Sequence, residues 1–368
     1  MTELYLGLMS GTSMDGVDAA LCEFAGQRFV RVRALHTQDY DASLRGELLR
    51  LQREKRPLTL ERYAQLDHAV AETFAEAAMA LLKRARVSAQ KIRAAGSHGQ
   101  TVFHDPLGVQ SSLQLGDPSL IAARTGLTVV ADFRRADIAH GGQGAPLVPA
   151  FHHALLASAR EKRCIVNIGG IANITVLSRA ASGVRGFDTG PGNGLMDEWS
   201  EAIRGERMDG GGQWAASGQL IPQLLEALSG DPYFGAAPPK STGRGYFNLE
   251  WMKRLYPGLD IAPRADVQRT LCELTARSIA DAIARHARGT QRVLACGGGA
   301  LNTFLLERLR TLAKVKVEST AALDLSPLAV EAAAFAWLAM RTLKGLPGNL
   351  PAVTGARKAA VLGGIYRA

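Results

Sequence analysis

The sequence predicts an α/β protein made of two similarly built halves, and three observations support this prediction. Apolar runs of strand length alternate with longer amphipathic segments along the chain, as strands alternate with helices in this class. A unit of strand, glycine-rich turn and strand occurs near the N-terminus and again near residue 164. The 368 residues are also too many for one ordinary hydrophobic core, so two domains are expected.

The first copy of the repeated unit lies at the start of the chain. The run 5–9 predicts a strand, and the turn-rich stretch 10–16 connects it to a second strand at 17–24. Residues 61–85 carry apolar side chains at helical spacing and predict a long amphipathic helix. A short strand then leads to Gly-Ser-His-Gly-Gln at 96–100.

The second copy begins near residue 164 and is followed by strand–helix pairs. Strands are expected at 164–168, 174–177, 292–296 and 360–366, a turn at 169–173, and helices at 303–313 and 327–345. Asn302 is placed to cap the helix at 303–313, and Gly345 stops the last helix.

Composition narrows the class of protein. Lys and Arg are scattered, so the net charge of +9 favours a solvated basic surface over nucleic-acid binding. The four cysteines are far apart and each lies in an apolar run, which is typical of buried thiols in a reducing compartment. The N-terminal residues do not resemble a signal peptide, and no run of about twenty apolar residues occurs. We therefore expect a cytoplasmic protein without membrane or nucleic-acid partners.

The first glycine turn has the chemistry of a phosphate site. None of the glycine turns is a Walker A loop or a dinucleotide fingerprint. A glycine turn between strands can still bring backbone N–H groups close to phosphate oxygens, and Ser10, Thr12 and Ser13 add hydroxyl donors. Asp15 and Asp18 follow, and a carboxylate beside a triphosphate implies Mg²⁺ between them.

An ordinary hairpin is the alternative explanation for one such turn taken alone. Two matching turns and a third glycine-rich turn at 297–299 favour a nucleotide clamp instead. The three glycines at 297–299 provide either a flat floor for an adenine ring or ribose, or close strand–helix packing, and the sequence leaves both options open.

Two carboxylates and one loop are candidates for the chemical step. Asp188 ends an apolar strand before a Gly/Pro turn, which favours a general base over a helix cap, since Asn193 is the better-placed cap. Glu331 is the single acid of an apolar helix, so it is exposed, paired or functional. The polar stretch 131–149 suits either a loop that grips an anionic ligand or a surface loop.

Eight segments together resemble the anhydro-N-acetylmuramic acid kinase family of the actin/hexokinase-like ATPase superfamily. They are LGLMSGTSMDGVD at 6–18, GSHGQT at 96–101, ADFRRADIAHGGQGAPLVP at 131–149, NIGGIAN at 167–173, GFDTGPGN at 186–193, PKSTGRGYFN at 239–248, CGGGALN at 296–302 and LPGNLPAVTGA at 346–356. They span the chain in the family's order, and together they are highly specific.

The resemblance implies a duplicated actin-like/ribonuclease-H-like fold with two domains around an ATP cleft that closes. It implies ATP contacts from Gly11, Thr12, Ser13, Met14, Asp15, Gly16, Val17, Asp18, Gly169, Gly170, Asn173, Gly297, Gly298 and Gly299. Mg²⁺ would be held by Asp15 and Asp18. Asp188 and Glu331 would be catalytic, and the sugar would be bound by Ser97, His98, Gln100, Arg134 and Gln143. The family opens the 1,6-anhydro ring of anhydro-N-acetylmuramate with water and phosphorylates O6, giving N-acetylmuramate 6-phosphate in peptidoglycan recycling.

Three other functions stay open at this point: a plain amino-sugar kinase, an ATP-driven interaction protein of the actin or Hsp70 kind, and a glycosidase using both carboxylates. The glycosidase leaves the phosphate turns unexplained, and the chain lacks a peptide-binding domain after the nucleotide fold. We expect a first domain of 1–130 plus 354–368 and a second of 131–353, because the resemblance returns the last strand to the first domain. The oligomeric state is left open, a homodimer included.

Overall fold

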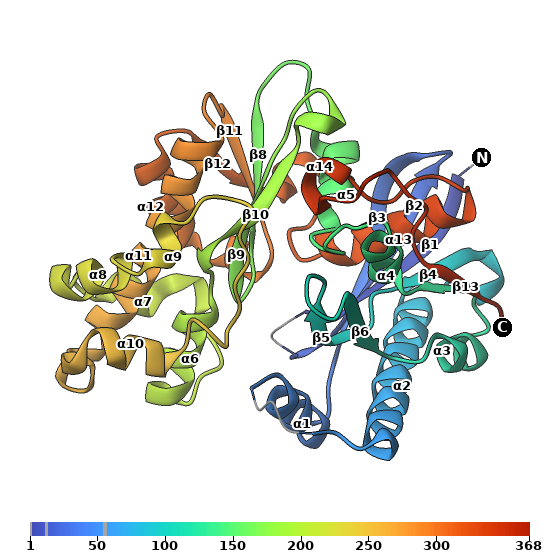
Figure 1. Ribbon diagram of the computed structural model, residues 1–368, viewed down its shortest axis with the longest axis horizontal. Helices are drawn as coiled ribbons and strands as arrows, with labels where there is room; N and C mark the ends of the chain where they lie inside the picture. Colours follow the sequence, from blue (N-terminus) through green and yellow to red (C-terminus); the bar gives the residue numbers. More distant parts are fainter. Residues whose placement is uncertain (1, 12–13, 54–56) are drawn as a thin grey trace. The chain divides into compact units, whose positions relative to one another are not determined.

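The computed structural model describes residues 2–11, 14–53 and 57–368 (Figure 1). The chain forms two compact units. Unit 1 comprises 1–155, 180–182 and 329–368, and unit 2 comprises 156–179 and 183–328. Over the described residues, no helix is both long enough and apolar enough to cross a membrane.

Unit 1 is built on a six-stranded sheet in the order β13-β7-β4-β1-β2-β3. The strands are β1 (Thr2–Met9), β2 (Gly16–Ala25), β3 (Arg28–Asp39), β4 (Ile92–Ser97), β7 (Val129–Ala131) and β13 (Gly364–Tyr366). β1, β2 and β3 form an antiparallel meander, whereas β4 and β7 run parallel to β1. β13 joins the edge next to β7, and it is shorter than the expected 360–366 because Ala360 is hydrogen-bonded to Asn349 and Gly348 instead.

Successive residues of β1 point to opposite faces of this sheet, and a long helix packs against each face. Leu6 and Leu8 lie in the core formed with α2 (Leu60–Ala85). Gly7 points to the other face, where an added Cβ would collide with the Ala332 carbonyl oxygen of α13 (Val330–Leu343). The remaining elements of unit 1 are α1 (Ala42–Arg53), α3 (Pro118–Thr125), α4 (Phe133–Ala139), α5 (Val148–Leu156), α14 (Pro351–Thr354) and a hairpin of β5 (Gln100–Asp105) and β6 (Ser111–Leu115).

The structure divides the chain at other positions than the expected 130/131 and 353/354. The segment after β7 stays in unit 1 because Phe151 of α5 packs against Phe29 of β3 and Trp337 of α13. Helix α13 also belongs to unit 1, since it packs on β1 and β4. Unit 1 therefore also contains residues 131–155 and helix α13, which the expected boundaries assigned to the second domain.

Unit 2 repeats the sheet of unit 1 with five strands in the order β10-β9-β8-β11-β12. These are β8 (Arg163–Ile168), β9 (Ile171–Val176), β10 (Arg185–Pro191), β11 (Arg292–Cys296) and β12 (Lys316–Ser319). β8, β9 and β10 are an antiparallel meander, and β11 and β12 run parallel to β8. The meander, the parallel pair and their order match β1–β3, β4 and β7, which confirms the predicted duplicated α/β fold.

Helices surround the sheet of unit 2, and α11 is the longest of them. They are α6 (Gly194–Arg204), α7 (Gln213–Ser217), α8 (Pro222–Ser229), α9 (Pro232–Gly235), α10 (Leu249–Leu255), α11 (Arg264–His286) and α12 (Thr303–Ala313). Asn302 caps α12 as expected, accepting a 2.9 Å hydrogen bond from the Leu305 N–H. The α11 carboxylate of Glu273 is buried and paired with Arg269 and Arg308, the latter on α12.

Candidate active site

The turn between β1 and β2 is fixed by two buried side chains of unit 1. The Ser10 hydroxyl lies 2.8 Å from the Gly16 carbonyl oxygen and 2.7 Å from Oε1 of Gln100. Nε2 of Gln100 donates a hydrogen bond of 3.3 Å to the Gly11 carbonyl oxygen. Both ends of the turn are therefore anchored to the neighbouring polypeptide. The predicted ATP contacts Thr12 and Ser13 fall outside the described residues.

His98 connects the same turn to Arg134. Its ring Nδ1 lies 3.2 Å from the Ser10 carbonyl oxygen, and its Nε2 lies 2.7 Å from Nη2 of Arg134. A guanidinium only donates, so we assign Nε2 as the acceptor and Nδ1 as the atom that donates to Ser10. Burial, and next the charge of Arg134, holds the pKa of His98 well below its usual range. The ring is therefore neutral and fixed in one tautomer.

Arg134 is a half-buried cation that contacts His98 and the Gly144 carbonyl oxygen and interacts electrostatically with Glu331. It donates a 2.8 Å hydrogen bond to the Gly144 carbonyl oxygen. Burial lowers the pKa of Arg134 to about 10, and the charges of Glu331 and Asp137 oppose that change. Glu331 lies half-buried in the first turn of α13. Glu331 is therefore a partly buried carboxylate in an electrostatic relation with Arg134, not a freely exposed one.

Asp15 and Asp18 supply two carboxylates beside the turn. Oδ1 of Asp15 accepts a 2.8 Å hydrogen bond from Arg45, and Oδ1 of Asp18 accepts one of 2.6 Å from Thr37. Burial raises the pKa of Asp18, and the charge of Asp15 adds to that rise while the Thr37 hydroxyl opposes it. Across the described ranges, no group of three or more His, Cys, Asp or Glu side chains is arranged to hold a metal ion. Two carboxylates fit Mg²⁺ that is held mainly by phosphate oxygens.

Asp188 lies in the middle of β10 and not at the end of a strand as expected, because the strand continues to Pro191. It is held by α9 and the segment that follows α9 in unit 2. Its Oδ2 accepts a 3.0 Å hydrogen bond from the Thr242 N–H, and its own N–H donates one of 3.2 Å to the Lys240 carbonyl oxygen. The Tyr233 hydroxyl donates a 2.9 Å hydrogen bond to the Asp188 carbonyl oxygen. Burial raises the pKa of Asp188 to about 6, while the Thr242 N–H and the Lys240 charge oppose the rise. Such a carboxylate is mostly ionised at pH 7 and basic enough to take a proton.

Three glycine segments of unit 2 pack directly on one another. The N–H groups of Gly192 and Gly194 each donate 3.0 Å hydrogen bonds to the Gly170 carbonyl oxygen. A Cβ at Gly192 would collide with the Gly169 carbonyl oxygen, and one at Gly297 would come within 2.7 Å of the Ile168 carbonyl oxygen. The turns at 169–170, 192–194 and 297–299 therefore form one compact floor. Close packing explains Gly297, but a Cβ at Gly298 would have open space, with a nearest atom 3.7 Å away on Asn193.

Comparison with known proteins identifies the family of this chain. The family model for anhydro-N-acetylmuramic acid kinase matches residues 3–368. The chain belongs to that family. It is 50% identical over 375 residues to the anhydro-N-acetylmuramic acid kinase of Variovorax paradoxus, covering 100% of this chain and 99% of that protein. It is 49% identical over 368 residues to the anhydro-N-acetylmuramic acid kinase of Shewanella oneidensis, covering 99% and 98%.

The fold has a more distant likeness among solved structures. The (R)-2-hydroxyglutaryl-CoA dehydratase component A of Acidaminococcus fermentans aligns with a TM-score of 0.51 at 9% identity, over 92% of this chain and 99% of that one. At this identity the likeness concerns the fold alone. The anhydro-N-acetylmuramic acid kinase assignment therefore depends on the family model and the sequence relatives.

The five residues predicted to bind the sugar in this kinase differ in how deeply they are buried. Ser97, His98 and Gln100 are buried, and the last two contact the first turn. Arg134 and Gln143 are half-buried, and Gln143 is held by a 2.8 Å hydrogen bond from its N–H to the Thr354 carbonyl oxygen. Direct sugar contact stays a prediction for these five residues. The geometry supports a role for His98 and Gln100 in shaping the turn.

Asp137 is a site-supporting residue that the sequence did not reveal. Its fully buried carboxylate accepts hydrogen bonds from the Gly144 N–H at 2.8 Å, Asn349 Nδ2 at 2.6 Å and the Thr354 hydroxyl at 2.8 Å. The kinase segments 131–149 and 346–356 are thus joined through one side chain. Both segments carry motifs of the kinase family, but no local pattern in the sequence shows that they contact each other.

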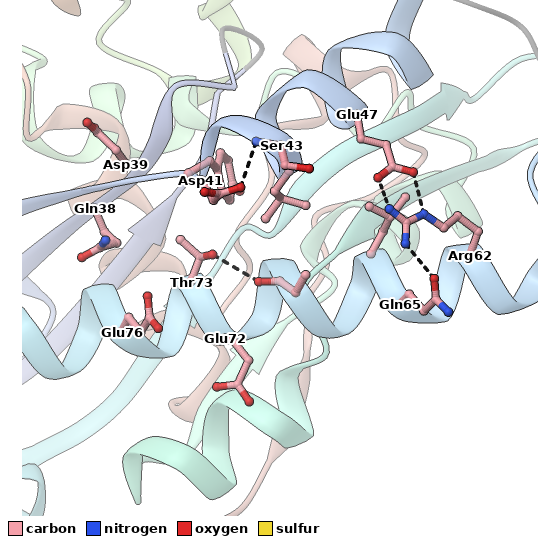
Figure 2. Close-up of a pocket in the computed structure, with 14 residues that line it drawn as sticks. Gln38, Asp39, Asp41, Ser43, Glu47, Arg62, Gln65, Glu72, Thr73 and Glu76 are labelled. Atoms are coloured by element: carbon pink, nitrogen blue, oxygen red, sulfur yellow. Dashed lines mark hydrogen bonds and ion pairs between the residues drawn. The ribbon is translucent and has the colours of Figure 1, made fainter.

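The pocket in Figure 2 lies in unit 1 and has a volume of about 620 Å³. It adjoins the first turn, since the N–H of its lining residue Tyr40 donates a 3.1 Å hydrogen bond to the Asp15 carbonyl oxygen. Five acidic residues line it: Asp39, Asp41, Glu47, Glu72 and Glu76. Glu47 and Glu72 are neutralised by ion pairs with Arg62 and Arg124. None of the predicted site residues lines this pocket.

Proposed function

We propose that this protein opens the 1,6-anhydro ring of anhydro-N-acetylmuramic acid with water and transfers the γ-phosphoryl group of ATP to O6. The product is N-acetylmuramic acid 6-phosphate, an intermediate of peptidoglycan recycling. The family assignment supports the substrate. The observation that supports the chemistry is Asp188, a partly buried carboxylate with a pKa of about 6 in the middle of β10.

In this proposal Asp188 acts as the general base. It takes a proton from the water that attacks the anomeric carbon, and the bond from that carbon to O6 breaks. The departing O6 carries the electron pair and attacks the γ-phosphorus in line, releasing ADP. Water thus supplies the new anomeric hydroxyl, and the sugar's own oxygen receives the phosphoryl group.

The glycine turns and the carboxylates of unit 1 are proposed to serve ATP. The turns at 11–16 and 169–170 would place backbone N–H groups on phosphate oxygens, and 297–299 would support the adenosine. Asp15 and Asp18 would hold Mg²⁺, which neutralises phosphate charge when it is bound. Glu331 would orient the water or the sugar. A cytoplasmic location belongs to the same proposal, and sedimentation of the purified protein will decide between monomer and homodimer.

Replacing Asp188 by Asn tests the assignment of the base. We expect Asp188→Asn to lower kcat by about 10²–10⁴, because the amide cannot take the proton from water. ATP affinity, measured by calorimetry, should stay nearly unchanged. Asp281→Asn is the control, since Asp281 is an exposed aspartate of the same unit. Activity of Asp188→Asn within about tenfold of the wild type would exclude Asp188 as the base.

A further inference from the structure

The segment 232–247 forms hydrogen bonds with both the main chain and the side chain of Asp188. The hydroxyl of Tyr233 donates to the Asp188 carbonyl oxygen, the Lys240 carbonyl oxygen accepts from the Asp188 N–H, and the Thr242 N–H donates to Oδ2. Three hydrogen bonds thus come from one stretch of chain outside the sheet.

The side chain of Lys240 contacts Tyr233 in two ways. Its ammonium group donates a 2.9 Å hydrogen bond to the Tyr233 carbonyl oxygen and lies 4.5 Å from the centroid of the Tyr233 ring. The ammonium group therefore fixes the residue whose hydroxyl holds the Asp188 backbone.

The charges near Asp188 come from several segments of the chain. Burial raises the pKa of the Asp188 carboxyl group, and the Thr242 N–H and the Lys240 charge oppose that rise. Burial, and next the charge of Arg285 on α11, lowers the pKa of Lys240, while the Asp188 charge opposes that change. Burial and the charges of Arg185, Lys240 and Arg285 lower the pKa of His286 on α11. Burial, and next the Asp188 charge, raises the pKa of Tyr233, so the phenol stays protonated and remains a donor.

We infer that Tyr233 and Lys240 are positioning residues for Asp188: the Tyr233 hydroxyl holds the main chain of β10 at Asp188, and the Lys240 ammonium group holds Tyr233. The inference rests on the proposed role of Asp188 as the base. The two contributions differ, because the Tyr233 hydroxyl binds the Asp188 main chain directly whereas Lys240 acts through Tyr233 and also carries a positive charge. Only a change at Lys240 is therefore expected to move the pH dependence.

The test compares Lys240→Met, Lys240→Arg and Tyr233→Phe by pH–rate profiles and by ¹³C NMR titration of the Asp188 carboxyl group. Lys240→Met should raise the Asp188 pKa and move the acid limb of kcat to higher pH. For a rise of half a pKa unit from about 6, the ratio of activity at pH 8 to that at pH 6 should rise about twofold. Lys240→Arg should restore the profile, and Tyr233→Phe should lower kcat without moving the limb. If Lys240→Met fails to fold, Lys240→Gln replaces it.

An unchanged NMR pKa of Asp188 in Lys240→Met would overturn the inference about Lys240. A Tyr233→Phe variant with wild-type kcat would overturn the one about Tyr233. The NMR measurement does not depend on catalysis, so it separates this inference from the proposed function. A shifted Asp188 pKa together with an active Asp188→Asn variant would reject Asp188 as the base and still support the influence of Lys240.

Discussion

At the scale of single residues, the first glycine turn depends on side chains that do not belong to it. His98 donates to the Ser10 carbonyl oxygen and accepts from Arg134, and Gln100 donates to the Gly11 carbonyl oxygen. These groups are buried, so an unpaired donor or acceptor left behind would cost about 1–3 kcal/mol. Buried side chains outside the turn thus maintain the shape of the proposed phosphate site.

This arrangement predicts the behaviour of two His98 variants. His98→Ala should raise the KM for ATP about tenfold, since about 1.4 kcal/mol corresponds to one factor of ten. His98→Asn should lie between wild type and alanine, because its amide N–H₂ can replace the Nδ1 donor. Steady-state kinetics with varied ATP measure both. Equal KM values for wild type and His98→Ala would show that the turn does not need this support.

The same residue carries a prediction about pH. The low pKa of His98 keeps the ring neutral at and above its ordinary titration range, so no step in the KM for ATP between pH 6 and 8 should belong to it. Kinetics of His98→Asn over that range provide the check. A wild-type step that disappears in His98→Asn would contradict a neutral His98.

At the scale of elements, α11 and α12 are joined by a buried ionic cluster. The Glu273 carboxylate accepts from Arg269 at 3.0 Å and from Arg308 at 2.8 Å. Burial opposes its ionisation, but Arg308 and Arg269 hold its pKa at about 2. A carboxylate whose pKa is lower in the folded state stabilises the protein above its unfolded pKa and loses that contribution as pH falls.

Glu273→Gln should therefore destabilise the protein by roughly 3–5 kcal/mol near pH 7, because it removes a buried carboxylate from the partly buried Arg269 and Arg308. The difference from wild type should narrow as the pH falls below about 4.5 toward about 2. Urea unfolding at several pH values measures it. Glu206→Gln is the control, since its half-exposed pair with Arg204 should contribute at most about 1 kcal/mol. A difference that does not depend on pH would rule out this ionic contribution.

The sequence predicted local features well and distant contacts poorly. The cap at Asn302 and the helix 303–313 were predictable because their signals lie within a few neighbouring residues. The Asp137 contacts to Asn349 and Thr354 span 212 and 217 residues, and no local pattern links such partners. The contacts of Lys240 and Tyr233 with Asp188 could not be predicted from the sequence either, because they use backbone groups that every sequence contains.

At the scale of the whole molecule, the two units share one sheet topology with a glycine turn between their first two strands. Unit 1 provides the turn with Asp15, Asp18 and the His98–Arg134 pair. Unit 2 provides the 169–170 turn, the glycine floor and Asp188. The duplication thus explains why two phosphate-type turns occur, whereas the proposed base belongs to unit 2 and Glu331 to unit 1.

The measurement that tests the central claim most directly is the reaction in H₂¹⁸O with ATP and anhydro-N-acetylmuramic acid. The position of the label in the 6-phosphate product is read by mass spectrometry and by ¹³C isotope shifts. Unlabelled N-acetylmuramic acid 6-phosphate in the same water corrects for exchange at the anomeric carbon. Hydrolytic phosphorylation by this chain predicts one ¹⁸O on the anomeric carbon and none on O6. A phosphorylated product without anomeric label beyond that correction would contradict it and indicate a plain sugar kinase.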